Sequence, residues 1–287
     1  MFVLIGYVIV LGCVFGGFII AGGNIMVIAR AAAIEMLIIG GGALGAFVAG
    51  NTLKNIKASI GGALGLLKGP KFGKDDYVEL LKLLYELLMK IRKEGLMAVE
   101  SHVENPESSS IFEKYPKVMA DHHLLDFITD CLRLMIGGNM NPHELEAVLE
   151  AELDTHHKEA HTPSHAVQTV ADGLPAFGIV AAVLGIVKVM EYVGNSPPEV
   201  IGQKVAAALV GTFLGILLGY GFVGPVASAM AARAEQDSKP FELVKIALLA
   251  SVRGYPPPVA IEFARKQLFS DLRPSFSDLE TELKGAK

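Results

Sequence analysis

The chain has 287 residues, of which 52% are hydrophobic and only 19% are charged. In soluble globular proteins about a quarter of the residues are charged. Here several long stretches carry no charge, while the rest of the chain is ordinary, and this distribution is typical of membrane spans joined to a soluble domain. The net charge of −5 gives no support to a nucleic-acid partner.

Four stretches are long and apolar enough to cross a bilayer, which takes about 20 residues of helix. We predict transmembrane helices at residues 1–21, 36–53, 172–192 and 204–232. No basic residue precedes the first stretch, as it would in a secretory signal, so we expect this stretch to remain as a helix. Two short turns, residues 22–35 and 193–203, join these helices in pairs.

The distribution of basic residues predicts the orientation of these spans. Basic residues follow the second and fourth spans, namely Lys54, Lys57, Lys68, Lys71, Lys74, Arg233 and Lys239. By the positive-inside rule, the long segment 54–171 and the tail 233–287 are cytoplasmic, as are both termini. The short turns then face the periplasm, although Lys188 and Lys204 count slightly against this orientation.

The two cytoplasmic segments have a helical pattern. Apolar residues recur at spacings of three and four over residues 78–91, with charges on much of the other face, until Asn105-Pro106. Further helical patterns cover residues 124–136, 141–153, 240–252 and 261–268. We therefore predict an all-α integral membrane protein with four transmembrane helices and a helical cytoplasmic domain. Cys13 and Cys131 fall in a span and in this domain, and we expect two free thiols.

The predicted spans contain no ionisable residue in their cores, and the second is free of charge between Glu35 and Lys54. Ionisable groups within a membrane usually mark ion pathways. Either the chain does not conduct ions, or a partner helix supplies the titratable carboxylate.

Small residues recur in the spans at a spacing that favours close helix packing. They are Gly12 and Gly16, Gly41 and Gly45, and Gly211, Gly215 and Gly219. They can pack within one subunit or between the subunits of a ring. Pro175 is expected at the start of the third span, where a missing N–H costs little. Pro225 weakens one backbone hydrogen bond of the fourth span, as a fixed kink or as a moving hinge.

Two long motifs resemble the third and fourth spans of the MotA proteins, in the MotA/TolQ/ExbB superfamily. Residues 174–182 read Leu-Pro-Ala-Phe-Gly-Ile-Val-Ala-Ala, and residues 210–218 read Val-Gly-Thr-Phe-Leu-Gly-Ile-Leu-Leu. Shorter matches lie at residues 6–23, 104–106, 220–225, 254–258, 262–263 and 273–276. The resemblance covers nearly the whole chain.

This resemblance implies a subunit of the bacterial flagellar stator, in the cytoplasmic (inner) membrane and without a cofactor. MotA proteins are thought to form a ring of five around two copies of MotB, whose transmembrane helix bears an aspartate. That aspartate would be the carboxylate missing from the spans. Protons moving past it drive the ring, which pushes the rotor protein FliG.

The resemblance also implies roles for residues at matching positions. The rotor contact is Arg92 and Glu100, and the coupling prolines are Pro175 and Pro225. The ion path is lined by Thr212 and Ala182, and the acidic positions at and near its cytoplasmic mouth are Asp172 and Glu152. Without the resemblance, Arg92 and Glu100 would be ordinary solvated charges of a helix.

A histidine cluster, His156, His157, His161 and His165, precedes the third span. His157 and His161 have the spacing of helical metal ligands, but a closed zinc site takes four ligands and Pro163 is expected to break the helix before His165. We therefore favour a solvated, partly protonated cluster over a metal site.

Three other functions are alternatives for a chain of this kind. An energiser of outer-membrane transport like ExbB or TolQ shares the ring mechanism but has three spans. A sodium-driven stator differs only in its coupling ion. Thr212 fits a proton path and a sodium path equally, because ion selectivity depends on the geometry of the pore and on residues of the partner. A membrane enzyme is disfavoured because the sequence has no nucleophile elbow, phosphate loop or zinc motif.

Overall fold

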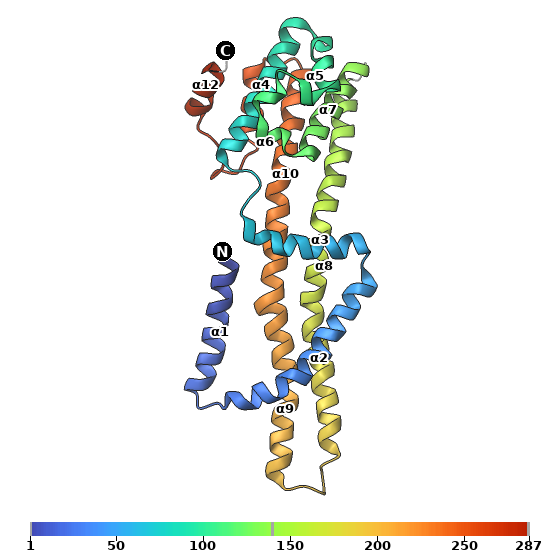
Figure 1. The fold of residues 1–287 in the computed structure, drawn as a ribbon, viewed down its shortest axis with the longest axis vertical. Helices are drawn as coiled ribbons and strands as arrows, with labels where there is room; N and C mark the ends of the chain where they lie inside the picture. Colours follow the sequence, from blue (N-terminus) through green and yellow to red (C-terminus); the bar gives the residue numbers. More distant parts are fainter. Residues whose placement is uncertain (1, 139–140, 286–287) are drawn as a thin grey trace. The chain divides into compact units, whose positions relative to one another are not determined.

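The computed structural model describes residues 2–138 and 141–285, and every regular element in them is helical (Figure 1). The prediction of an all-α protein is confirmed. The α-helices are α1 (Phe2–Ile20), α2 (Ile25–Gly50), α3 (Leu53–Gly65), α4 (Lys74–Glu94), α5 (Glu100–Glu104), α6 (Pro116–Met119), α7 (His122–Gly137), α8 (Pro142–Met190), α9 (Pro198–Ile216), α10 (Gly224–Val252), α11 (Pro257–Arg265) and α12 (Phe276–Gly285).

The chain forms two compact units. The first, here called the span unit, comprises Met1–Gly69 and His161–Arg233. The second, the globular unit, comprises Pro70–Ala160 and Ala234–Lys287. The long helices α8 and α10 contribute residues to both units. The unit boundaries differ from the predicted ones, because α3 belongs with the spans and not with the segment that follows them.

Four helical stretches are long and apolar enough to cross a membrane: Phe2–Ile20, Ile25–Gly50, Pro142–Met190 and Pro198–Val252. The chain is therefore a membrane protein with the predicted number of spans. The third and fourth extend beyond the predicted limits, since their helices continue through polar residues that a search for uncharged stretches leaves out.

The predicted turn at residues 22–35 is wrong beyond Asn24, because α2 already begins at Ile25. The Asn24 side chain caps the helix by accepting a hydrogen bond from the Met26 N–H at 3.0 Å. As a result Arg30 and Glu35 lie inside α2. The expectation that the spans lack ionisable residues is therefore also wrong, because α2 continues through these two charged residues.

Two prolines lie inside α8, where helix breaks or starts were expected. Pro163 does not interrupt the helix, and Pro175 lies well after its first residue. A proline within a helix leaves the carbonyl four residues earlier without its usual donor. For Pro175 that carbonyl belongs to Ala171, and neighbouring helices in a membrane bundle commonly compensate such breaks.

The backbones of α8 and α9 approach closely through glycines. A Cβ atom on Gly215 would lie 2.7 Å from the Leu174 carbonyl oxygen and 2.8 Å from the Gly178 Cα. A Cβ on Gly219 would lie 2.5 Å from the Ala171 carbonyl oxygen. These glycines thus pack within one subunit, the first of the two alternatives.

The other glycine pairs behave differently. A Cβ on Gly12, Gly16, Gly41 or Gly45 would meet no heavy atom of the described residues within 4 Å, apart from its own near neighbours in the chain. These four positions therefore leave a smooth surface on α1 and α2, which suits a contact with another helix.

A π-helical segment, Leu217–Val223, separates α9 from α10 and ends two residues before Pro225. Within it, the Phe222 carbonyl accepts a hydrogen bond from the Tyr7 hydroxyl of α1 at 2.8 Å, and the two rings are 4.7 Å apart. Pro225 cannot donate the usual backbone hydrogen bond, and the chain forms wide helical turns before it without ending the helix. Such turns are frequent at functional sites.

The core of the globular unit forms around α4. Its apolar face follows the helical spacing of the sequence, and its buried side chains are Tyr77, Leu80, Leu81, Leu83, Leu84, Leu87 and Leu88. They pack with apolar residues of α7, α11 and the Phe241–Ala250 part of α10. Each buried leucine stabilises this unit by about 1.5–3 kcal/mol relative to an exposed one. Cys131 is buried here, and both cysteines are free, as expected.

One buried cation holds the C-terminal part of the chain against this core. The Arg265 guanidinium is 6% exposed and donates to both carboxylate oxygens of Glu262 at 2.7 Å. It also donates to the Pro274 carbonyl oxygen at 2.7 Å. These bonds lower the pKa of Glu262. The pair therefore stabilises the fold above the ordinary pKa of a glutamate, and this contribution is lost as the pH falls through the lowered value.

Replacing Gly215 by alanine should destabilise the span unit, because the added methyl group meets backbone atoms that cannot rotate away. Overpacking of this kind costs about 1–3 kcal/mol. We expect Gly215→Ala to lower the thermal midpoint of the purified full chain in detergent by several degrees. Gly202→Ala on the same helix is the control, since a Cβ there meets no described atom within 4 Å. Equal midpoints for the two variants would contradict the packing described.

Replacing Arg265 by methionine should remove both contacts of the buried guanidinium. Breaking a buried ion pair costs about 3–5 kcal/mol, and we expect the lower end because Glu262 is 27% exposed. The matched control is Arg253→Gln, which breaks a more exposed pair with Glu146 and should cost at most about 1 kcal/mol. Thermal unfolding of the full chain measures both, and a milder effect at Arg265 than at Arg253 would refute the assigned role.

Candidate functional site

The predicted ion-path residues lie where α8 and α9 touch. Ala182 is buried on α8, and Thr212 is half-buried on α9. A Cβ on Gly211, the residue before Thr212, would lie 3.2 Å from the Ala182 backbone nitrogen. The two predicted positions are thus brought to the same contact by residues far apart in the chain.

The two prolines predicted to act in coupling, Pro175 and Pro225, lie next to the π-helical segment. A Cβ on Gly219 would lie 2.9 Å from the Pro175 Cδ, so the ring of Pro175 lies directly against this segment. Pro225 follows the segment along the chain. A displacement of α8 at Pro175 would therefore act on the helical turns that precede Pro225.

The predicted acidic residues of the mouth lie in different units. Asp172, in the span unit, is exposed and accepts a hydrogen bond from the Gln168 side-chain amide at 2.9 Å. Glu152 is an exposed residue of the globular unit. Their assignment to an ion path stays a prediction.

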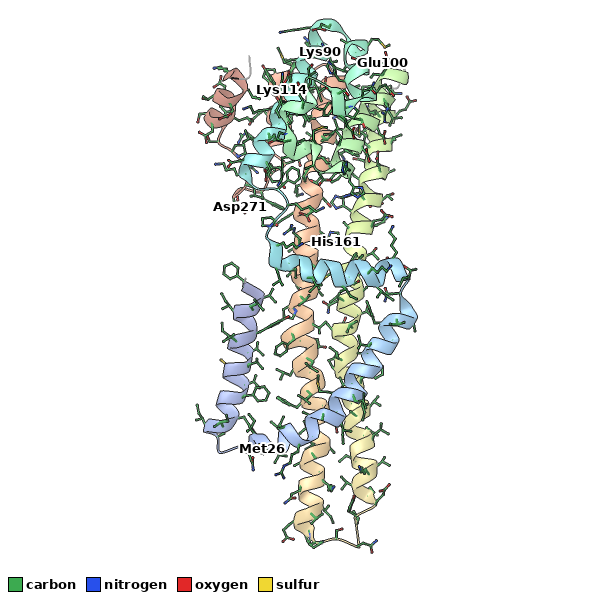
Figure 2. The ribbon with its side chains drawn as sticks, in the orientation of Figure 1. Met26, Lys90, Glu100, Lys114, His161 and Asp271 are labelled. Atoms are coloured by element: carbon green, nitrogen blue, oxygen red, sulfur yellow. The ribbon has the colours of Figure 1, made fainter. Side chains whose placement is uncertain are left out.

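The predicted rotor-contact residues are both exposed at one end of the globular unit. Arg92 lies in the last turn of α4, where a cation interacts favourably with the helix dipole, and Glu100 begins α5. Gly95, with φ of 89°, turns the chain between them. Nearby, Lys90 forms an ion pair with Glu94 at 3.1 Å. Figure 2 shows Lys90 and Glu100 at the same end of this unit.

The histidine cluster is divided between the units. In the globular unit, the His156 ring packs on Phe241 with centroids 4.1 Å apart, and the His157 Nε2 lies 3.5 Å from a carboxylate oxygen of Glu242. Burial lowers the pKa of His156, which favours its neutral form. The expectation of a solvated, partly protonated cluster is therefore wrong for His156. Of the four, His165 in the span unit is exposed.

Sequence reasoning missed Glu35. It is 8% exposed, in a small apolar core formed by α2, α8 and α9. The signal that could have revealed it is the unbroken helical run of apolar residues on both sides of Glu35. A single acidic residue between two apolar runs does not end a helix, and α2 continues through Glu35.

Two family descriptions match the chain. Residues 4–95 match "Motility protein A N-terminal", and residues 120–242 match the "MotA/TolQ/ExbB proton channel family". Two solved structures are similar in fold. The MotAB structure from C. jejuni aligns with a TM-score of 0.73 at 20% identity, over 95% of this chain and 98% of that one. The flagellar MotAB stator complex from Bacillus subtilis aligns with a TM-score of 0.69 at 22% identity, over 97% of this chain and 98% of that one.

Curated relatives are more similar in sequence. Motility protein A of Salmonella typhimurium (strain LT2) is 44% identical over 287 residues, which is 100% of this chain and 96% of the relative. Motility protein A of Escherichia coli (strain K12) has the same identity and coverage. Chemotaxis protein LafT of Vibrio parahaemolyticus is 43% identical over 276 residues, which is 96% of each chain. At this identity and coverage, the chain belongs to the Motility protein A family, a branch of the MotA/TolQ/ExbB proton channel family.

Proposed function

We propose that this chain is the MotA subunit of a bacterial flagellar stator, which forms a proton channel with MotB and converts ion flow into torque on the rotor. The observation that carries this function is the 44% identity to Motility protein A over the whole chain, without a large gap. The fold shared with two MotAB structures supports it. The activity requires no cofactor beyond the proton motive force.

The family resemblance implies a ring of five chains around two MotB helices, and the surfaces left open in the span unit support contacts with other helices. None of the residues of α1 is buried, although this helix is strongly apolar. Its glycines and those of α2 leave flat strips that a neighbouring helix can cover. Lipid and adjacent subunits are the occupants that match these apolar faces.

In the proposed orientation the globular unit and both termini are cytoplasmic, and the two short connections face the periplasm. The basic residues after the second and fourth spans support this through the positive-inside rule. The exposed residues Arg92, in the last turn of α4, and Glu100, at the start of α5, are then available to the rotor protein FliG.

Protons are proposed to pass along the α8–α9 contact near Thr212 and Ala182, beside an aspartate supplied by MotB. Asp172, and Glu152 further along, would attract cations on the cytoplasmic side. Movement of the partner helix against Pro175 would displace the π-helical segment before Pro225. Wide turns of this kind are frequent at functional sites, which suits a coupling element.

Swimming tests this function directly. In a strain that lacks its own MotA, this gene and its MotB should restore motility that persists without sodium and stops with a protonophore. If motility requires sodium, the chain is still a stator subunit, but its coupling ion is sodium and not the proton. A correctly assembled complex that never turns a rotor would instead favour an energiser of the ExbB or TolQ type.

Charge reversal at the rotor contact should reduce torque without unfolding the protein. Exposed charges contribute about 0–1 kcal/mol to stability and act mainly in partner choice. We expect Arg92→Ala to be mild, because Lys90 and Lys93 keep this end basic, and Arg92→Glu with Lys93→Glu to slow swimming several-fold. The control Lys284→Glu changes an exposed lysine of α12 and should swim normally at equal protein amounts. Normal swimming by the double variant would exclude this contact.

A further inference from the structure

The least expected group in the span unit is the carboxyl of Glu35. Its side chain is more than nine-tenths buried, and its Oε2 atom has no hydrogen-bond partner among the described residues. It lies on α2, which forms a small apolar core with α8 and α9 through Ile39, Ala181 and Val210. A buried carboxylate without a partner is costly, so such a group is retained where it binds a proton or another cation.

The backbone of α9 leaves room for this carboxyl. A Cβ on Gly211 would lie 2.6 Å from the Glu35 Oε2 and 3.1 Å from the Ala181 Cβ. No side chain larger than hydrogen can stand there without moving the carboxyl. The glycine of the α8–α9 contact therefore also makes the recess into which Glu35 points.

The recess opens into a cavity of about 570 Å³ within the span unit. Its polar and charged lining residues are Asn24, Arg30, Glu35, Lys188, Gln203 and Lys204. Asn24 caps the start of α2, Lys188 is near the end of α8, and Lys204 lies in the early part of α9. These helix ends adjoin the two short connections, so the polar end of the cavity lies at that membrane face. Glu35 lies about 16 Å further along α2, at 1.5 Å per residue.

Three basic residues line the cavity together with Glu35, namely Arg30 on α2, Lys188 on α8 and Lys204 on α9. The Glu35 carboxyl lies between the apolar recess at Gly211 and this polar cavity. A carboxyl in this place can take up a proton from the cavity and release it again. A sodium ion would need several oxygen ligands, whereas the recess offers one side-chain carboxyl.

We propose that Glu35 is a proton-binding residue of this subunit, reached through the cavity from the membrane face of the two short connections. The carboxylate takes a proton from a hydronium ion in the cavity, which becomes water, and the neutral acid returns the proton to water in the reverse step. This inference rests on the proposed stator function. It adds a titratable group on the ring to the aspartate expected on the partner, so the ring itself changes charge as protons pass.

Carbodiimide labelling tests the site without any rotor. Dicyclohexylcarbodiimide reacts with protonated carboxyls in apolar surroundings, and mass spectrometry locates the adduct. In the complex with MotB, Glu35 should be labelled, and more strongly at acidic than at alkaline pH. The control is Glu199, an exposed carboxyl at the start of α9, which should stay unlabelled. An unlabelled Glu35 at every pH overturns the proposal.

Motility of variants tests whether the site is used. Glu35→Gln should reduce swimming speed at least tenfold, Glu35→Asp should retain part of it, and Glu199→Gln should swim normally, with equal amounts of each protein in the membrane. Normal swimming by Glu35→Gln overturns the proposal. If Glu35→Gln does not accumulate, the labelling of the wild-type complex decides. If the wild-type gene restores no motility, the stator function fails, while the labelling still decides whether Glu35 binds protons.

Discussion

The close backbone contact between α8 and α9 is the constraint on which the span unit depends. Gly178 and Gly215 let the two helices approach to distances at which any side chain would collide with backbone atoms. In a membrane, where lipid is as apolar as the helices, such van der Waals contact is a main source of helix association. The positions of Pro175, Thr212 and Glu35 all follow from this contact, since each lies on it or beside it.

The polar and irregular features of the span unit gather along this same contact. Pro175 removes one backbone donor, the π-helical segment widens the helix, and Glu35 places a carboxyl in an apolar core. Each of these features costs free energy in a membrane, where unsatisfied groups cannot turn to water. Pro175 lies against Gly219 and Glu35 against Gly211, so these costs fall on the helix contacts that involve α9 and the π-helical segment after it.

In the globular unit, stability and the choice of a partner depend on different residues. Its stability comes from the buried leucines of α4 and from the contacts of Arg265, both inside the unit. Its surface charges, including Arg92 and Glu100, contribute little to that stability. They are therefore free to determine which partner binds, and their change should alter recognition before it alters folding.

The fold class, the number of spans, the helical pattern of the globular unit and the family could be predicted from the amino-acid sequence, because apolar periodicity and long motifs are local properties. The continuation of helices through Pro163, Pro175 and Glu35 could not be predicted, since local rules treat prolines and charges as helix ends. These positions depend on contacts between helices that are far apart in the sequence. Neighbouring helices supply the close contacts and the recess at Gly211 that make such residues acceptable inside a span, and no local pattern contains those neighbours.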